Sequence, residues 1–276
     1  MVTDNPKHKD RRFRQFITVA FAVLVAAINA DAQTAAKGSQ IAKAGFANEA
    51  AIAAKFNNWQ ADNDARLWLA AMGFLPSRIE SVSAARPHGA KSDVEVTVKS
   101  DGKTAVHGIS IKLVSNTTGF NQIDKRWVST YAKAWNMPAD VIEALKLFVG
   151  ELKPTKPVRT AGRTYLNELS KEQQKAVVDF FTANKEMIAS DLFEGDGGHA
   201  AGWFLVAYRA SEKPLWTFRP ARDAAKFFSE GPVEITRAGN LKIGRITMQR
   251  KGGDGGRETA KMLQFKINPL HLIDAD

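Results

Sequence analysis

Two stretches of the sequence carry polar residues whose types and spacing could together bind a metal ion and a phosphate. Polar and apolar residues alternate from Asp93 through Glu95, and Ser110 and Lys112 alternate with apolar residues in a second run. The two-residue period of a β-strand places the two acids on one face, and Ser110 and Lys112 on one face of the next strand. An acid and a lysine on adjacent strands can converge on a single point. The same pattern is also typical of a solvated hairpin face with cross-strand ion pairs.

Asp93 and the run Ser110-Ile111-Lys112 fit a relaxed pattern of metal-dependent nucleases. Hydrolysis of a phosphodiester requires a metal ion that polarises the phosphate and lowers the pKa of the attacking water. The Asp93 carboxylate supplies the hard oxygen ligand that magnesium prefers. Lys112 can orient this water, help to deprotonate it, or offset the charge that develops at phosphorus. Because the pattern occurs by chance in many sheets, it indicates a nuclease only with support from other stretches.

The composition indicates a globular protein with a negatively charged partner. The chain has 276 residues, a formal net charge of +10 and a sequence pI of about 9.7. Such a basic balance favours binding to a polyanion or to an acidic membrane surface. The sequence contains no cysteine, which excludes a disulfide framework, a zinc-thiolate site and a cysteine nucleophile.

The elements that must position the polar residues predict an α+β or mixed α/β fold, because groups of helices and groups of strands follow one another. Hydrophobic periodicity and capping residues predict helices over residues 35–58, 62–72, 123–135, 138–148, 171–190 and 222–228. Strands are predicted over residues 79–84, 94–98, 108–114, 203–209, 215–218, 233–237, 241–249 and 261–267. No internal repeat and no second domain is evident, so residues 38–276 are interpreted as one domain.

The N-terminus has the three-part pattern of a secretory signal. Several basic residues precede an apolar run from Phe16 to Ile28, and Ala30-Asp31-Ala32 resembles a cleavage site. The apolar run is short for a membrane span. An ordinary helix, or an upstream extension from a start codon placed too early, would produce the same pattern.

Four stretches carry a resemblance to a known family. They are GFANEAAIAAKFNNW, KSDVEVTV, IKLVSNTTGFNQIDKRW and GRITMQRKGGDGGRETAKMLQFKINP, and together with VGEL they extend the resemblance from about Gly38 to the C-terminus. The chain resembles type II restriction endonucleases of the PD-(D/E)xK superfamily. It is most similar to the GCGC-cutting enzymes of the HinP group, and more distantly to MspI-like enzymes. The resemblance implies a central mixed β-sheet flanked by helices and Mg²⁺-dependent double-strand cleavage of DNA at a short GC palindrome, expected to be GCGC.

The resemblance assigns roles to the residues of the two central stretches. By position, Asp93 is the metal-ligating aspartate and Lys112 is the catalytic lysine. Ser110 stands where the family usually has Glu, Asp, Gln or Asn, and its hydroxyl is a poorer magnesium ligand than a carboxylate.

Three other groups are candidates for the metal contact that Ser110 supplies weakly. They are the backbone carbonyl of Ile111, the side chain of Glu95, and Glu49 on the predicted N-terminal helix, where the superfamily often has an extra acid. Glu49 and Glu95 could equally be ordinary surface charges.

The segment after the second strand is the first candidate DNA contact. Phe120 lies in a polar run and is interpreted as a wedge between base pairs, although a loop residue folded onto the core is the alternative. The amides of Asn121 and Gln122 can meet base edges, and Lys125 adds a cation to the same segment.

A basic segment near the C-terminus is the second candidate DNA contact. Gln249, Arg250, Lys251 and Arg257 lie among glycines that allow close approach of the backbone to a groove. Arginine bound through two hydrogen bonds to guanine is the commonest specific base contact, and a GC site would demand it. A solvated surface or nonspecific phosphate binding is the alternative for such a basic patch.

The interpretation divides the chain into an N-terminal extension, residues 1–37, and a single endonuclease domain, residues 38–276, with a catalytic core and a C-terminal DNA-recognition part. The expected partners are double-stranded DNA and, genetically, a cognate DNA methyltransferase, with no stable membrane association and a homodimer as one candidate assembly. The expected location is the cytoplasm, and the periplasm or the exterior is the alternative. Two other functions remain open: a DNA-binding protein that Ser110 has weakened or inactivated, and a secreted nonspecific nuclease.

Overall fold

The computed structural model of the chain describes residue 40 and residues 42–273, apart from 88–90, 117–118, 196, 198–199, 213 and 254–255. The chain divides into two units, Met1–Ala44 and Gly45–Asp276, and the second unit contains both β-sheets. The predicted extension over residues 1–37, with its signal-like run, lies outside the described residues. In the part that is described, no helix is both long and apolar enough to cross a membrane.

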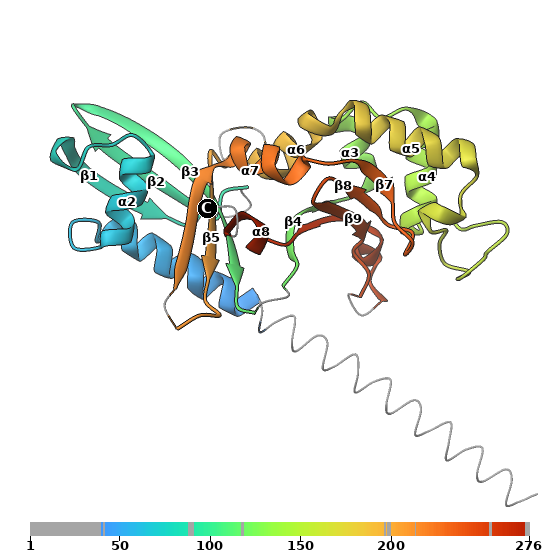
Figure 1. Cartoon of the computed structure of the whole chain (residues 1–276), viewed down its shortest axis with the longest axis horizontal. Coiled ribbons are helices and arrows are strands. Elements are labelled where there is room, and N and C mark those ends of the chain that lie inside the picture. The colour runs from blue at the N-terminus through green and yellow to red at the C-terminus, as the bar shows by residue number, and fades with distance from the viewer. Residues whose placement is uncertain are drawn as a thin grey trace, which may run out of the picture. The chain divides into compact units, whose positions relative to one another are not determined.

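The first sheet is mixed and carries both of the central stretches. Its five strands have the order β1-β2-β3-β5-β6 (Figure 1). All neighbours are antiparallel except β3 and β5, which are parallel. The strands are β1 (Ile79–Ala85), β2 (Val94–Ser100), β3 (Lys103–Val114), β5 (Trp203–Tyr208) and β6 (Leu215–Pro220).

The second sheet is antiparallel throughout and has the order β4-β10-β9-β8-β7. Its strands are β4 (Asn121–Arg126), β7 (Val233–Ile235), β8 (Leu241–Ile243), β9 (Ile246–Arg250) and β10 (Leu263–Ile267). The edge strand β4 contains a bulge, because Gln122 and Asp124 pair with the consecutive residues Lys266 and Phe265 and leave Ile123 as the extra residue.

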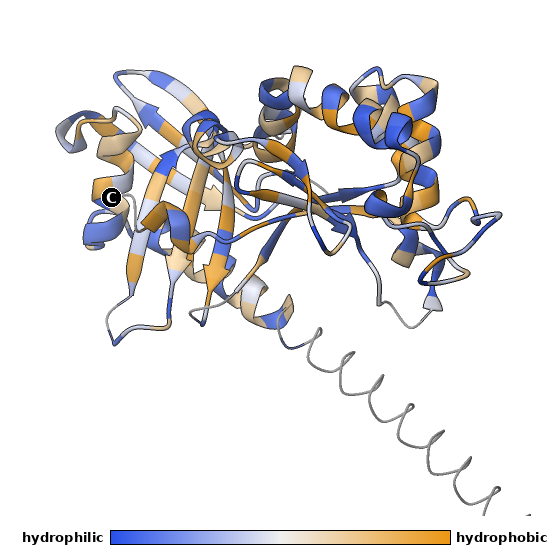
Figure 2. Cartoon of the chain, turned by 45° about the vertical axis from the view of Figure 1, so that its right-hand side comes forward, coloured by the Kyte–Doolittle hydropathy of each residue, from blue (hydrophilic) through white to orange (hydrophobic). Residues whose placement is uncertain are grey.

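Strand β5 joins the two hydrophobic cores of the second unit. Its sequence WFLVAY is apolar throughout because both faces of the strand are covered. Leu205 and Ala207 belong to the core beneath the first sheet, whereas Phe204 and Val206 belong to the core shared with the second sheet. Strand β2 instead alternates between buried valines and partly exposed polar residues, which is the predicted pattern for a strand with one solvated face. Figure 2 shows apolar and polar residues side by side along the strands.

Helices cover the cores from several sides. A helix over residues 42–57 contributes Ile52 and Phe56 to the core beneath the first sheet, and α2 (Asn63–Ala71) contributes Trp68 and Leu69. Asp62 caps α2, because its side chain accepts a hydrogen bond from the Ala65 amide. The remaining α-helices are α3 (Val128–Ala134), α4 (Ala139–Val149), α5 (Lys171–Ala183), α6 (Lys185–Glu194), α7 (Ala221–Ser229) and α8 (Leu270–Ile273).

The predicted fold class is confirmed, but the strands divide between two sheets instead of forming one. The prediction of a helix over 123–135 is wrong in its first part, because residues 121–126 form strand β4 and only Val128–Ala134 are helical. Asn121, Gln122 and Lys125 therefore lie on a strand, not in a loop or helix. The segment Asn121–Arg126 contains one apolar residue, Ile123, so it shows no hydrophobic periodicity that could distinguish a strand from a helix.

Two other predicted elements are interrupted in the structure. The helix predicted over 171–190 is divided at Asn184, which ends α5 and begins α6 and whose amide donates to the Phe180 carbonyl at 2.9 Å. The strand predicted over 241–249 is divided into β8 and β9 at Gly244. Gly244 has a φ of +57° and lies against the Ser229 and Glu230 carbonyls, where a side chain would collide.

Candidate active site

Asp93, Ser110 and Lys112 come together at the point that the sequence predicted. The Nζ atom of Lys112 lies 3.7 Å from Oδ2 of Asp93, and donates hydrogen bonds to Oγ of Ser110 and to the carbonyl oxygen of Ile111, both at 3.1 Å. Oδ2 of Asp93 accepts a hydrogen bond from the Ile111 amide at 2.6 Å and one from the Ser110 hydroxyl at 3.4 Å. A carboxylate, a hydroxyl and a carbonyl oxygen therefore surround one cation.

The pairing of β2 with β3 produces this arrangement. Val94 is opposite Ile109, and the amide of Asp93 extends the ladder by donating to the Ile109 carbonyl at 2.8 Å. Ser110 is buried. The side chain of Lys112 is only 12% exposed, and its Nζ atom lies over the Phe204 ring. These contacts restrict the rotamers of both side chains, as a preorganised site requires.

The donor set fits a magnesium ion, the cofactor that the resemblance implies. Magnesium prefers oxygen ligands, and the three oxygen atoms of Asp93, Ser110 and Ile111 already converge on a positive charge. The described residues contain no cluster of three or more His, Cys, Asp or Glu side chains, so any site here relies on hydroxyl and carbonyl oxygens as well as carboxylates.

The two additional acids occupy different positions. Burial raises the pKa of Glu49 above its usual value, and the negative charge of Asp93 adds to this. The positive charges of Arg86 and Lys112 oppose the shift, and these charges place Glu49 near the centre. Glu95 is half-buried on β2 and accepts a hydrogen bond from the Ser92 hydroxyl at 3.4 Å. Burial and the charge of Asp93 thus act together on the Glu49 carboxyl and raise its pKa.

One face of the second sheet brings several of the candidate DNA contacts together. The amide of Gln264 donates to Gln122 at 2.7 Å, and the amide of Gln249 donates to Gln264 at 3.2 Å. Lys125 is paired with Gln264, and Lys266 with Gln122, so their side chains share this face. We call the set Gln122, Lys125, Gln249, Gln264 and Lys266 the amide face.

The remaining candidates in the first DNA-contact segment do not belong to the amide face. Phe120 lies just before β4 with 57% of its surface exposed, so it is not folded onto the core. Asn121 is paired with the buried Ile267 and so projects towards the opposite side of the sheet from Gln122.

Arg250 also projects away from the amide face. It follows Gln249 on β9, shares a face with the buried Met248, and is paired with Leu263. The Nε atom of Arg250 is buried without a hydrogen-bond partner among the described residues. Burial and the positive charge of Arg163 lower the Arg250 pKa.

Lys251 and Arg257 lie beyond β9 in the glycine-rich segment. The amide of Lys251 donates to the Met262 carbonyl at 2.8 Å. Arg257 is exposed and directly precedes a short 3₁₀ helix, Glu258–Lys261.

Arg163 is a functional candidate that the sequence prediction missed. Its guanidinium group stacks 4.0 Å from the centre of the Tyr165 ring, on which Arg159 also stacks at 4.6 Å. The Leu166 amide donates to the Gly239 carbonyl at 3.1 Å, which attaches this segment to the end of the second sheet beside Arg250. Its basic composition was the available signal, but only the fold brings it next to β9.

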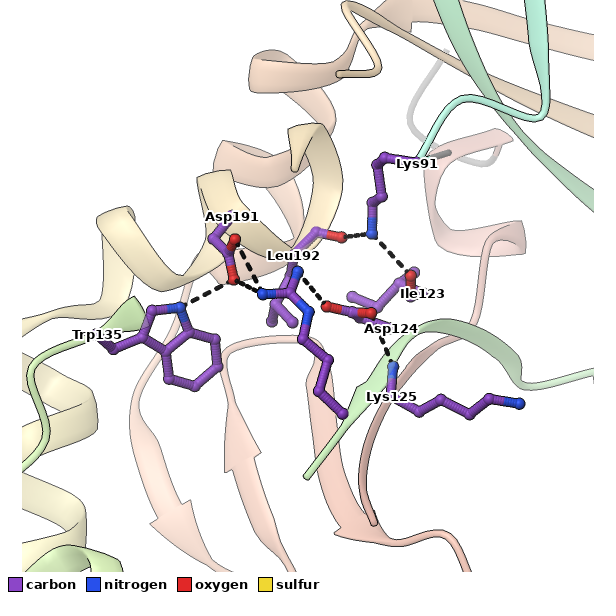
Figure 3. Close-up of polar contacts among 8 residues, drawn as sticks. Lys91, Ile123, Asp124, Lys125, Trp135, Asp191 and Leu192 are labelled. Carbon is purple, nitrogen blue, oxygen red and sulfur yellow. Dashed lines mark hydrogen bonds and ion pairs between the residues drawn. The ribbon is translucent and has the colours of Figure 1, made fainter. Parts of the chain in front are cut away.

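A polar cluster between the two sheets was also missed. Arg126 on β4 pairs with Asp124 at 2.6 Å and with Asp191 on α6 at 3.0 Å, and the indole of Trp135 donates to Asp191 at 2.9 Å. Lys91 joins this cluster, and removal of its ammonium group from water lowers its pKa to about 8, against the opposing influence of Asp124 and Asp191 (Figure 3).

Comparisons with known proteins agree with the fold. A family model described as the R.HinP1I restriction endonuclease matches residues 72–273. The structure is similar to a crystal structure of the restriction endonuclease MspI in complex with its cognate DNA, with a TM-score of 0.54 and 13% sequence identity over 77% of this chain and 80% of that chain. No curated protein matches the sequence.

The family match extends over most of the chain, including both central stretches and the second sheet. It confirms the enzyme class predicted from the sequence, a type II restriction endonuclease, and the solved structure confirms the fold. The chain belongs to the R.HinP1I restriction endonuclease family.

Proposed function

We propose that this endonuclease cleaves both strands of DNA at a short GC palindrome, GCGC, in a magnesium-dependent reaction centred on Asp93 and Lys112. The observation that carries the proposal is the convergence of the Asp93, Ser110 and Ile111 oxygen atoms on the Lys112 ammonium group. The family match and the GCGC-cutting enzymes that the sequence resembles support the choice of site.

Each residue of the centre has a defined task. Asp93 and the Ile111 carbonyl would hold Mg²⁺, with Ser110 as a weak third ligand and Glu49 or Glu95 as additional acids. A magnesium ion held there would supply polarisation of the scissile phosphate and a lower pKa of the attacking water. Lys112 orients this water and offsets the charge that develops on the phosphate oxygens.

The metal requirement is tested on a duplex with a single GCGC site. Cleavage is expected with Mg²⁺, and EDTA is expected to abolish it because the Asp93 carboxylate alone cannot stabilise the transition state. A duplex of identical composition with the site scrambled to CCGG is the matched control. Undiminished cleavage in EDTA would refute the metal role, and equal cleavage of the scrambled duplex would refute GCGC as the target.

The DNA interface combines the amide face with the residues around it. Gln122 and Gln249 present amides that both donate and accept hydrogen bonds, and Lys125 faces phosphates or base edges beside them. The exposed Phe120 acts as a wedge next to this face, and Asn121, which follows it, projects from the opposite side of the sheet. Lys251 and Arg257 extend the basic surface along the glycine-rich segment.

Arg250 is the last residue of β9 and projects from the face opposite the amide face, so we expect it to reach a guanine beyond the end of the strand. Its buried Nε atom has no hydrogen-bond partner among the described residues and can donate to a ligand. Arg250→Ala should lower discrimination between the cognate duplex and a duplex with one changed base pair by about 1–3 kcal/mol. Competition binding with both duplexes measures this.

The control for Arg250 is Lys242→Ala, which removes an exposed cation on the neighbouring strand β8 that is paired with Glu234. This control should weaken binding to both duplexes equally, because it removes only general electrostatic attraction. Unchanged discrimination in Arg250→Ala would remove this residue from the set of base readers.

The biological setting follows from the activity. A nuclease that cuts unmodified DNA is compatible with its host only if the host's own sites are protected, so a cognate DNA methyltransferase is the expected genetic partner and the cytoplasm is the proposed location. A palindromic target is compatible with a homodimer in which each subunit cuts one strand.

A further inference from the structure

Lys91 precedes Asp93 by two residues and contacts two elements outside the proposed active site. Its Nζ atom donates a hydrogen bond of 2.9 Å to the carbonyl oxygen of Ile123 on β4, and another to the carbonyl oxygen of Leu192 on α6 (Figure 3). Ile123 is the bulge residue of an edge strand, and Leu192 lies in the last turn of its helix. Carbonyls at such positions have no partner in the regular pattern of their own element. The Lys91 ammonium therefore satisfies one carbonyl from each of two elements.

The surroundings of Lys91 hold its ammonium group in one place. Its two hydrogen bonds run to the carbonyls of Ile123 and Leu192. Burial lowers the pKa of Lys91, and the carboxylates of Asp124 and Asp191 oppose this. A charge removed from water is costly unless it is hydrogen-bonded, and the two carbonyls meet that need.

The packing around the Lys91 stem is close. Gly195 ends α6 with a φ of +70°, and a Cβ atom there would lie 2.8 Å from Cγ of Lys91. The end of the helix thus has room for the lysine side chain only because position 195 is glycine.

We propose that Lys91 is a positioning residue for cleavage, which holds the segment carrying Asp93 against the strand that carries Gln122 and Lys125. The connection is direct. Ile123 lies between the two DNA-contacting residues of β4, and its carbonyl is bound to Lys91. Lys91 is joined through the buried Ser92 to Asp93, whose amide is bound to β3. This inference rests on the proposed roles of Asp93 and the amide face.

The consequence is that DNA binding and metal-assisted cleavage are linked through one side chain. A change in the position of β4 on DNA is transmitted to the Asp93 carboxylate, so loss of the Lys91 contact should impair the chemical step more than binding. A misplacement of about 1 Å at a reacting centre can cost about 100-fold in rate.

The test compares Lys91→Met, Lys91→Arg and Lys99→Met with the wild-type full chain. Lys91→Met removes the donors but keeps the apolar stem, Lys91→Arg keeps charge and donors, and Lys99→Met removes an exposed lysine of β2 that pairs with Glu80. Thermal unfolding checks the fold, equilibrium binding without Mg²⁺ gives affinity for the GCGC duplex, and rapid mixing of the preformed complex with Mg²⁺ gives the cleavage rate.

Lys91→Met is expected to cleave about 100-fold more slowly at unchanged affinity, with partial recovery in Lys91→Arg and no effect in Lys99→Met. Wild-type cleavage by Lys91→Met, or an equal loss of affinity and rate, would overturn the inference. If Lys91→Met does not fold, Lys91→Gln is measured in the same way, and a wild-type rate there would overturn it. Asp93→Ala is run in parallel: if Asp93→Ala still cleaves, the proposed active site itself is wrong, whereas an inactive Asp93→Ala beside a fully active Lys91→Met refutes only the role of Lys91.

Discussion

Asp93→Ala and Lys112→Ala are each expected to abolish DNA cleavage while leaving DNA binding intact. The Oδ2 atom of Asp93 accepts a hydrogen bond from the Ile111 amide of β3 and lies 3.7 Å from the Lys112 ammonium. No other carboxylate in the described part of the chain makes both contacts. Loss of the metal ligand or of the lysine removes several kcal/mol of transition-state stabilisation, which corresponds to at least about 1000-fold in rate. Binding should persist because the amide face lies on the other sheet.

A matched control for both variants lies on the same sheet. Glu80 and Lys99 form an exposed ion pair of 2.6 Å between β1 and β2, so Glu80→Ala and Lys99→Ala remove an acid and a lysine without touching the centre. Single-turnover cleavage and gel-shift binding are measured for all four proteins. An active Asp93→Ala or Lys112→Ala enzyme would refute the assignment, and a loss of binding that matches the loss of cleavage would mean that these residues serve DNA affinity instead.

Asp191→Ala is expected to lower the free energy of unfolding by about 3 kcal/mol, near the lower end of the range for breaking a buried ion pair. The Asp191 carboxylate accepts hydrogen bonds from Arg126 at 3.0 and 3.2 Å and from the Trp135 indole at 2.9 Å. Truncation leaves the Arg126 guanidinium and the indole N–H partly buried without this acceptor, which costs more than the ion pair itself contributes.

Urea denaturation measures this loss, and Asp179→Ala is the control. Asp179 pairs with Lys175 one turn earlier on the same helix, α5, and both side chains are largely exposed, so its removal should change stability by less than about 0.5 kcal/mol. An Asp191→Ala protein as stable as the control would show that the cluster does not stabilise the fold.

The convergence of Asp93, Ser110 and Lys112 could be predicted from the sequence because its signals are local. The alternation of buried valines with Asp93, Glu95 and Thr97 identifies β2, and the same period places Ser110 and Lys112 on one face of β3. A turn at Asp101 and Gly102 makes these strands neighbours. Their proximity therefore required no information from distant parts of the chain.

The second sheet was harder to predict because its pairing is distant in sequence. Gln122 and Gln264 are 142 positions apart, and only their contact shows that β4 is an edge strand and that Gln264 completes the amide face. Gln249 and Arg250 were predicted as parts of one DNA contact. Consecutive residues of a strand face opposite sides of the sheet, so part of their separation could have been predicted.

Lys91 had no local signal, because its partners Ile123 and Leu192 come from other elements. Arg163 lies in a basic segment, but its position beside Arg250 depends on the fold.

The central claim is tested most directly by digestion of unmethylated phage DNA with the purified enzyme and Mg²⁺, followed by sequencing of all fragment ends. The account predicts discrete fragments whose ends share one short GC palindrome, with GCGC as the expected sequence. Ends scattered without a shared sequence, or intact DNA under conditions in which the protein binds it, would contradict the account.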